Sequence, residues 1–190
     1  MTGIEEIIEA LVTAMDAAEE LRERSFRDSR EIIRVSKKAI NSIHRDQDPA
    51  PFLKECRIRN DDMLSYLGDA TQRGAVEDAM MELAEAFLLD AILNDEPLPD
   101  PAALNVSDRA WILGLADVPG ELRRRCLDLL RDGRVDEADG ILEKMETVHE
   151  ALMRFDHPDA VLPVRRKQDV SRSVVERTRG DVASALVSRR

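Results

Sequence analysis

The spacing of apolar and polar positions is helical along most of the chain. Between residues 4 and 24, apolar side chains recur three or four positions apart, and the intervening polar positions are mostly glutamate. This spacing predicts an amphipathic helix whose apolar stripe packs on a core. The stripe consists of Ile4, Ile7, Ile8, Leu11 and Met15.

The same spacing predicts further helices between clusters of proline and glycine. Proline-rich segments at 46–51 and 94–105 mark the clearest connections, because proline cannot continue a helix. Strict alternation of polar and apolar residues, which marks a half-buried strand, is missing. The sequence therefore predicts one all-α domain over residues 1–190. The further helices cover about 26–45, 52–72, 79–93, 111–131, 135–155 and 164–187.

Two of these helices carry acidic side chains in apolar surroundings. In 79–93, Glu82 and Glu85 are two of only three polar residues, so this helix should lie in the interior. In the helix over 111–131, Asp117 and Glu121 stand four positions apart and share a face. Carboxylates are rarely buried without a partner, so something positive should face both pairs. The simplest common partner is a hard divalent cation with oxygen ligands.

Pro119 lies between Asp117 and Glu121 and is expected to kink or interrupt their helix. This break leaves an alternative open. Asp117 would then cap a new helix that starts at Pro119, with Glu121 in its first turn. Upstream, Ser107 is the expected N-cap of the helix over 111–131.

The predicted helix over 26–45 carries a basic stripe, although the chain has a formal net charge of −11. Such a stripe is typical of a surface that follows a phosphate backbone. The alternative is a solvated face paired with acids of a neighbouring helix. A second basic cluster occupies 164–190. The stripe consists of Arg27, Arg30, Arg34, Lys37, Lys38 and Arg45.

Three further residues are interpreted as structural. Cys56 and Cys126 lie far apart and outside any metal-binding spacing, so they are expected to be buried thiols in a reducing compartment. His149 is interpreted as a hydrogen-bonded structural residue. No apolar run approaches the roughly 20 residues that span a bilayer, so we expect a soluble, cytoplasmic protein with no membrane contact.

Four segments of the chain together match a family pattern. They are RDSREIIRVSKKAINSIHR (Arg27–Arg45), MELAEA (Met81–Ala86), LGLADVPGELRRRC (Leu113–Cys126) and RKQDVSRSVVERTRGD (Arg166–Asp181). In this combination the chain resembles the translin family, especially its Trax-like and prokaryotic-type members. The LADxxGEL portion is the most specific part of the resemblance.

The resemblance implies an all-α subunit of about seven helices that assembles into octameric shells around single-stranded or short RNA. In the Trax branch, acidic residues of two helices hold Mg²⁺ and cut RNA, whereas the translin branch binds nucleic acid. Carried over to this chain, Glu82, Glu85 and Asp117 would be the catalytic and metal-binding carboxylates, with Glu121 beside them. This chain is shorter than eukaryotic Trax, its loop between Glu85 and Asp117 is compact and its C-terminal helix is more basic. With a single chain, we expect a homo-oligomer and not a mixed translin–Trax assembly.

Three functions are compatible with these residues. The leading hypothesis is an endoribonuclease of Trax type that depends on Mg²⁺ or Mn²⁺. The second is a protein of translin type that binds RNA or single-stranded DNA without cutting it. The third is an unrelated all-α nucleotide pyrophosphatase, suggested by the Glu82-x-x-Glu85 spacing alone.

Overall fold

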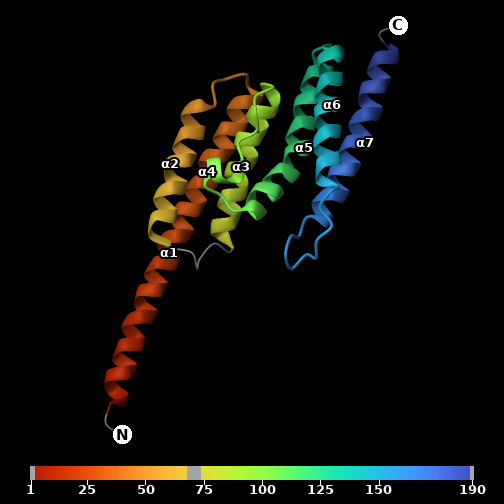
Figure 1. Ribbon diagram of the computed structural model, residues 1–190. Helices are drawn as coiled ribbons and strands as arrows, with labels where there is room; N and C mark the ends of the chain where they lie inside the picture. Colours follow the sequence, from red (N-terminus) through yellow and green to blue (C-terminus); the bar gives the residue numbers. More distant parts are fainter. Residues whose placement is uncertain (1–2, 68–73, 189–190) are drawn as a thin grey trace.

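The computed structural model describes residues 3–67 and 74–188, and all regular secondary structure in these residues is helical (Figure 1). The all-α prediction is confirmed. The helices are α1 (Ile4–His44), α2 (Ala50–Leu67), α3 (Ala75–Leu93), α4 (Pro101–Leu104), α5 (Asp108–Arg131), α6 (Val135–Leu152) and α7 (Arg165–Ser188).

The long helix α1 replaces two predicted helices. No glycine or proline stands between Ile4 and His44 to end a helix. Ser25, at the predicted break, does not start a new helix, because its hydroxyl donates to the carbonyl of Arg22 at 2.8 Å. The prediction of separate helices over 4–24 and 26–45 was therefore wrong.

The first half of α1 extends beyond the rest of the molecule (Figure 1). We call residues 4–20 the N-terminal arm, and every one of them is exposed. The predicted packing of their apolar stripe on a core was wrong within this chain, because Ile7 is 61 % exposed and Met15 is 63 % exposed.

The core lies where α3 packs between α1 and α5. Gly114 of α5 makes the closest part of this packing possible. A Cβ atom at this position would lie 2.7 Å from the carbonyl oxygen of Met81 and 3.0 Å from the amide nitrogen of Glu85, both on α3. Glycine is therefore required for the two backbones to approach this closely.

Helix α5 begins at the predicted cap, since the Ser107 hydroxyl accepts a hydrogen bond from the amide of Ala110 at 3.0 Å. It then continues through Pro119, which is buried. Pro119 does not interrupt the helix, so the alternative in which Asp117 caps a new helix was wrong. Core packing on both sides of Pro119 keeps the helix intact.

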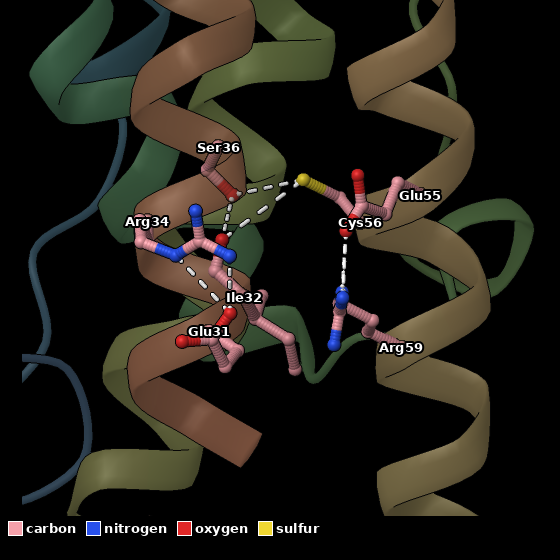
Figure 2. Close-up of polar contacts among 7 residues, drawn as sticks. All are labelled: Glu31, Ile32, Arg34, Ser36, Glu55, Cys56 and Arg59. Carbon is pink, nitrogen blue, oxygen red and sulfur yellow. Dashed lines mark hydrogen bonds and ion pairs between the residues drawn. The ribbon is translucent and has the colours of Figure 1, made fainter. Parts of the chain in front are cut away.

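The remaining helices cover the two outer sides of this core. Helix α2 packs on α1, where the buried Ser36 hydroxyl lies 3.4 Å from the Cys56 sulfur (Figure 2). On the other side, α6 and α7 pack on α5 and on each other. His149 of α6 lies with its Nδ1 3.1 Å from the Ser171 hydroxyl of α7. Cys56 and Cys126 are free and buried, as predicted, and the reducing compartment stays a prediction.

Several helix boundaries differ from the predictions: α2, α3 and α5 begin two to four residues earlier than predicted, at Ala50, Ala75 and Asp108, and α6 ends at Leu152. Helix α2 is described as far as Leu67, and the predicted continuation to Gln72 falls outside the described residues. The loop predicted over 94–105 contains the one-turn helix α4, which Asp100 caps by accepting from the amide of Ala103. None of the helices described here is long and apolar enough to cross a bilayer. Cytoplasmic location stays a prediction.

Candidate functional site

A cavity of about 490 Å³ lies between α1, α3 and α5. It is lined by both carboxylate pairs that the sequence analysis selected, and by basic and polar side chains of α1 and α5. The lining residues are Lys37, Ile40, Asn41, Glu82, Glu85, Asp117, Glu121 and Arg124. All four predicted carboxylates therefore meet at one site, which we call the carboxylate cluster.

Helix geometry and one glycine bring the two pairs together. Glu82 and Glu85 stand three residues apart on α3, and Asp117 and Glu121 stand four apart on α5, so each pair shares a face. Gly114 lies one turn before Asp117 on the same face. Its close contact with α3 sets how near the α5 carboxylates come to Glu85.

Three of the four carboxylates have basic side-chain partners. Lys37 Nζ of α1 lies 3.5 Å from Glu82 Oε1. Lys167 of α7 donates to both carboxylate oxygens of Asp117. The ring of His44, only 2 % exposed, donates from Nε2 to Glu121 Oε2 at 2.5 Å.

Glu85 is the most buried member of the cluster, at 8 % exposure. Burial raises its pKa to about 8, and the neighbouring charges of Asp117, Glu82 and Glu121 act in the same direction. Glu85 is therefore protonated at neutral pH in this arrangement. The charge of Lys167 opposes this shift but does not outweigh it, and a stronger positive charge nearby would favour the ionised form.

The pKa values of Glu82 and Glu121 are shifted in opposite directions. Burial raises the pKa of Glu82, and the nearby Lys37 opposes this. The hydrogen bond from His44 lowers the pKa of Glu121. Glu121 is therefore ionised, whereas Glu85 is protonated.

Three of the four carboxylates, those of Glu82, Asp117 and Glu121, contact these basic partners. Within residues 3–67 and 74–188, no three histidine, cysteine, aspartate or glutamate side chains are arranged to hold a metal ion together. The donor set itself, four carboxylates on two facing helices, has the chemistry that Mg²⁺ and Mn²⁺ require.

The predicted basic stripe of α1 is exposed along its whole length. Arg34 pairs with Glu31 of the same helix (Figure 2), and Lys37 reaches the carboxylate cluster. Lys38 and Arg45 line a neighbouring hollow of about 320 Å³, and Asn41 lines both this hollow and the cavity. Arg27 and Arg30 lie farther along α1 toward the arm.

Sequence reasoning missed three partners of the cluster: His44, Lys167 and Arg124, whose Nη1 lies 3.9 Å from Glu121 Oε2. His44 closes the α1 segment just before Arg45, and its Nδ1 has no hydrogen-bond partner among the described residues. Lys167 belongs to the second basic cluster, which was noted without a partner. No local spacing pairs either residue with α5, since His44 is 77 positions from Glu121 and Lys167 is 50 positions from Asp117.

The fold and the site define an all-α protein with an acidic cavity bordered by a basic helix. Two solved structures at 32 % identity share this fold: AfC3PO (TM-score 0.88, covering 96 % of this chain and 98 % of that one) and an AfC3PO–duplex RNA complex (TM-score 0.84, covering 96 % and 97 %). The chain belongs to the translin family, to which these C3PO proteins are assigned.

Two other comparisons extend this result. An uncharacterized protein of Methanocaldococcus jannaschii is 33 % identical over 193 aligned positions, which cover 94 % of this chain and 87 % of that protein. The structure of apo-NeC3PO is 18 % identical, with a TM-score of 0.85, and covers 97 % of this chain and 98 % of that one, so it supports the fold alone. No family model matches the chain.

Proposed function

We propose that this protein is an RNA-binding endoribonuclease that depends on Mg²⁺ or Mn²⁺ and cuts single-stranded or short RNA inside a homo-oligomer. The observation that carries the proposal is the convergence of four carboxylates from two helices on one cavity, beside a basic helix face. A nuclease needs both parts, since the carboxylates hold the cation and the basic face holds the phosphate backbone.

Glu82, Glu85 and Asp117 would hold the cation. Bound there, it would supply the Lewis acid that polarises a phosphoryl oxygen and makes a bound water a nucleophile. Glu85 fits this role because its burial leaves it protonated without a cation and ready to ionise beside one.

Glu121 has a different role in this proposal. His44 fixes its carboxylate in place and in the ionised form that can accept a proton from the attacking water, although the lowered pKa makes Glu121 a weaker base. It lines the same cavity as the other three acids, so it could also serve as a further ligand. Cleavage in this manner would leave 5′-phosphate ends.

The basic stripe of α1 would position RNA through its phosphates without reading its sequence. Support comes from AfC3PO, a relative at 32 % identity whose structure has been solved in complex with duplex RNA. Lys37 joins the two parts of the site, because it belongs to the stripe and also contacts Glu82.

The N-terminal arm supports the homo-oligomer, which the family resemblance specifies as an octamer. Its apolar stripe has no cover within the described chain, and a second copy of this chain would supply one. The arm has six acidic and no basic residues, so two arms repel each other. The exposed arginines of α7, which flank the exposed Val170, would provide a complementary surface on a second copy, although Arg165, Arg172 and Arg179 also pair with acids of their own chain.

The test is cleavage of a labelled single-stranded RNA with Mg²⁺ and with chelator, by the wild-type protein and by Glu85→Gln. We expect cleavage only by the wild type with Mg²⁺, while Glu85→Gln still binds RNA. The matched control is Glu150→Gln, an exposed glutamate of α6, which should cut normally. Cleavage that continues in Glu85→Gln or in chelator would contradict the proposal.

A second candidate function is RNA or single-stranded DNA binding without catalysis. The observation that favours it is that Glu82, Asp117 and Glu121 already have basic side-chain partners, so their burial needs no cation. It predicts salt-sensitive RNA binding that Glu82→Ala leaves intact, and no products with any divalent cation.

A further inference from the structure

We propose that Lys167 and Lys37 hold Asp117 and Glu82 as counter-charges in the cation-free protein, and are released to contact RNA phosphate when a divalent cation binds. This inference rests on the proposed function, because it requires the carboxylate cluster to bind a cation. It gives a binding role to Lys167, which lies outside the basic stripe of α1.

Lys167 is directed into the cluster. Its ammonium donates to both oxygens of Asp117, although the two residues belong to different helices. Its charge also favours the ionised forms of Glu82 and Glu85. The side chain of Lys167 is 25 % exposed. It is therefore more restrained than a lysine on the surface, but solvent can still reach it.

The position of Lys167 is unfavourable for α7 itself. It stands in the first turn of the helix, after Arg165 and Arg166, and this turn contains no acidic residue. Positive side chains at a helix N-terminus oppose the helix dipole. The contact with Asp117 compensates for this placement, and the helix end adds to the positive potential beside the cluster.

Lys167 is not needed to hold α7 against α5. Arg123 of α5 already joins the helices, donating to the Thr178 hydroxyl at 2.8 Å and pairing with Asp181 at 2.9 Å. The buried apolar residues Val174, Val175 and Val182 of α7 add to this packing. The Lys167–Asp117 pair is therefore available for exchange without loss of the helix interface.

Lys37 of α1 is placed for the same exchange at Glu82. Its side chain is 60 % exposed and its ammonium lies 3.5 Å from Glu82, so the contact is open to solvent. It also lies on the basic stripe, next to Arg34 in the direction of the helix axis. A small rotation of its side chain would take the ammonium from Glu82 to the face proposed for RNA.

The charges of the exchange balance. Two ammonium groups carry the same total charge as one divalent cation, so the cation replaces them at Asp117 and Glu82 without changing the charge at these two carboxylates. The released ammonium groups then face the RNA backbone. Cation binding and RNA binding should therefore strengthen each other.

The test compares Mn²⁺ binding in the absence of RNA, measured by calorimetry, for wild type, Lys167→Met and Lys37→Met. If the lysines compete with the cation, each substitution should tighten Mn²⁺ binding about three- to tenfold, because an ion pair no longer has to be broken. RNA binding with Mn²⁺ present should weaken in the same variants. Lys54→Met, at an exposed position of α2 outside the cavity, should change neither.

The outcomes separate this inference from the proposed function. Unchanged or weaker Mn²⁺ binding in both variants, with clear binding by the wild type, would overturn the exchange and leave the cation site standing. No Mn²⁺ binding by the wild type would overturn both.

A measurement on the unsubstituted protein covers the case in which a variant fails to fold. Acetylation of Lys167, followed by mass spectrometry, should become faster when Mn²⁺ is added, because the ammonium leaves Asp117. Acetylation at an unchanged or slower rate would contradict the exchange.

Discussion

Charged side chains usually face solvent and apolar side chains are usually buried. The carboxylate cluster is an exception to the first rule, and the N-terminal arm is an exception to the second. The cluster places acidic groups in the interior, and Glu85 is only 8 % exposed. The arm places isoleucine, leucine and methionine in solvent, each more than half exposed. Both departures are unfavourable for an isolated chain.

The two regions differ in what the chain itself supplies. Around the cluster, α1, α5 and α7 provide basic partners for three carboxylates, and Glu85 avoids its charge by retaining a proton. Around the arm, no described residue covers the apolar stripe. Three of the four carboxylates thus have their partners within one chain, whereas the arm is uncovered within the described residues and would be covered by a second copy in the proposed homo-oligomer.

The largest effect is expected on assembly. Ile7→Glu combined with Leu11→Glu places two charges on the apolar stripe, so it should reduce the mass measured by light scattering from that of an oligomer to that of a smaller species. The unfolding free energy of the subunit should change by less than about 0.5 kcal/mol per site, because both positions are exposed.

Thr13→Glu is the matched control for the arm, since Thr13 lies on its opposite face and is also exposed. It should leave the mass unchanged. An unchanged mass in the double variant would show that the stripe is not covered in the assembly.

The next effect concerns pH and the cluster. The pKa of Glu85 rises from 4.5 to about 8 on folding, so the folded chain holds one more proton than the unfolded chain between these values. Stability without cation should therefore fall as pH rises through this window, by at most about 1.4 kcal/mol per pH unit from this residue. Glu85→Gln should remove this contribution.

Urea unfolding in chelator between pH 5 and pH 9 measures this dependence. Glu150→Gln, the exposed control on α6, should keep the wild-type slope. If Glu85→Gln also keeps the wild-type slope, Glu85 is ionised in the folded chain, and its pKa is not raised by burial.

A smaller effect tests how α5 is held against α3. Gly114→Ala forces a methyl group against the carbonyl of Met81, so it should destabilise the protein by about 1–3 kcal/mol. Gly140→Ala, in α6 with nothing within 4 Å of the added atom, should stabilise it by about 0.5–1 kcal/mol. If the urea midpoints of both variants lie above that of wild type, or both lie below it, the predicted difference is contradicted.

The smallest effect is expected at the edge of the basic stripe. Arg30 is exposed, so Arg30→Ala should weaken RNA binding modestly. It should also reduce the slope of log affinity against log salt by about 0.7–0.9, the loss of one phosphate contact. An unchanged slope would place Arg30 outside the RNA-binding face.

The sequence was sufficient to predict which acids meet. A carboxylate on a largely apolar helix is costly to bury without a partner, whatever the arrangement of the helices. It was also sufficient for the start of α5, since the Ser107 cap is a local feature. It failed for the arm, because an amphipathic stripe requires cover but does not specify whether that cover comes from the same chain.

The partners of the cluster could not be predicted for a related reason. His44 and Lys167 reach α5 from distant positions in the sequence, and only the packing of α1 and α7 against α5 brings them there. The continuous path of α5 through Pro119 likewise depends on packing that outweighs a local preference against helix.

The central claim, that the carboxylate cluster is a divalent-cation site, is tested most directly by anomalous diffraction from crystals of the protein grown with RNA and Mn²⁺. We expect an anomalous peak in the cavity between Glu82, Glu85 and Asp117, with Lys37 and Lys167 turned away from their carboxylates. Bound RNA with no peak in this cavity, and with both lysines still paired, would contradict the claim and leave a protein that binds RNA without cutting it.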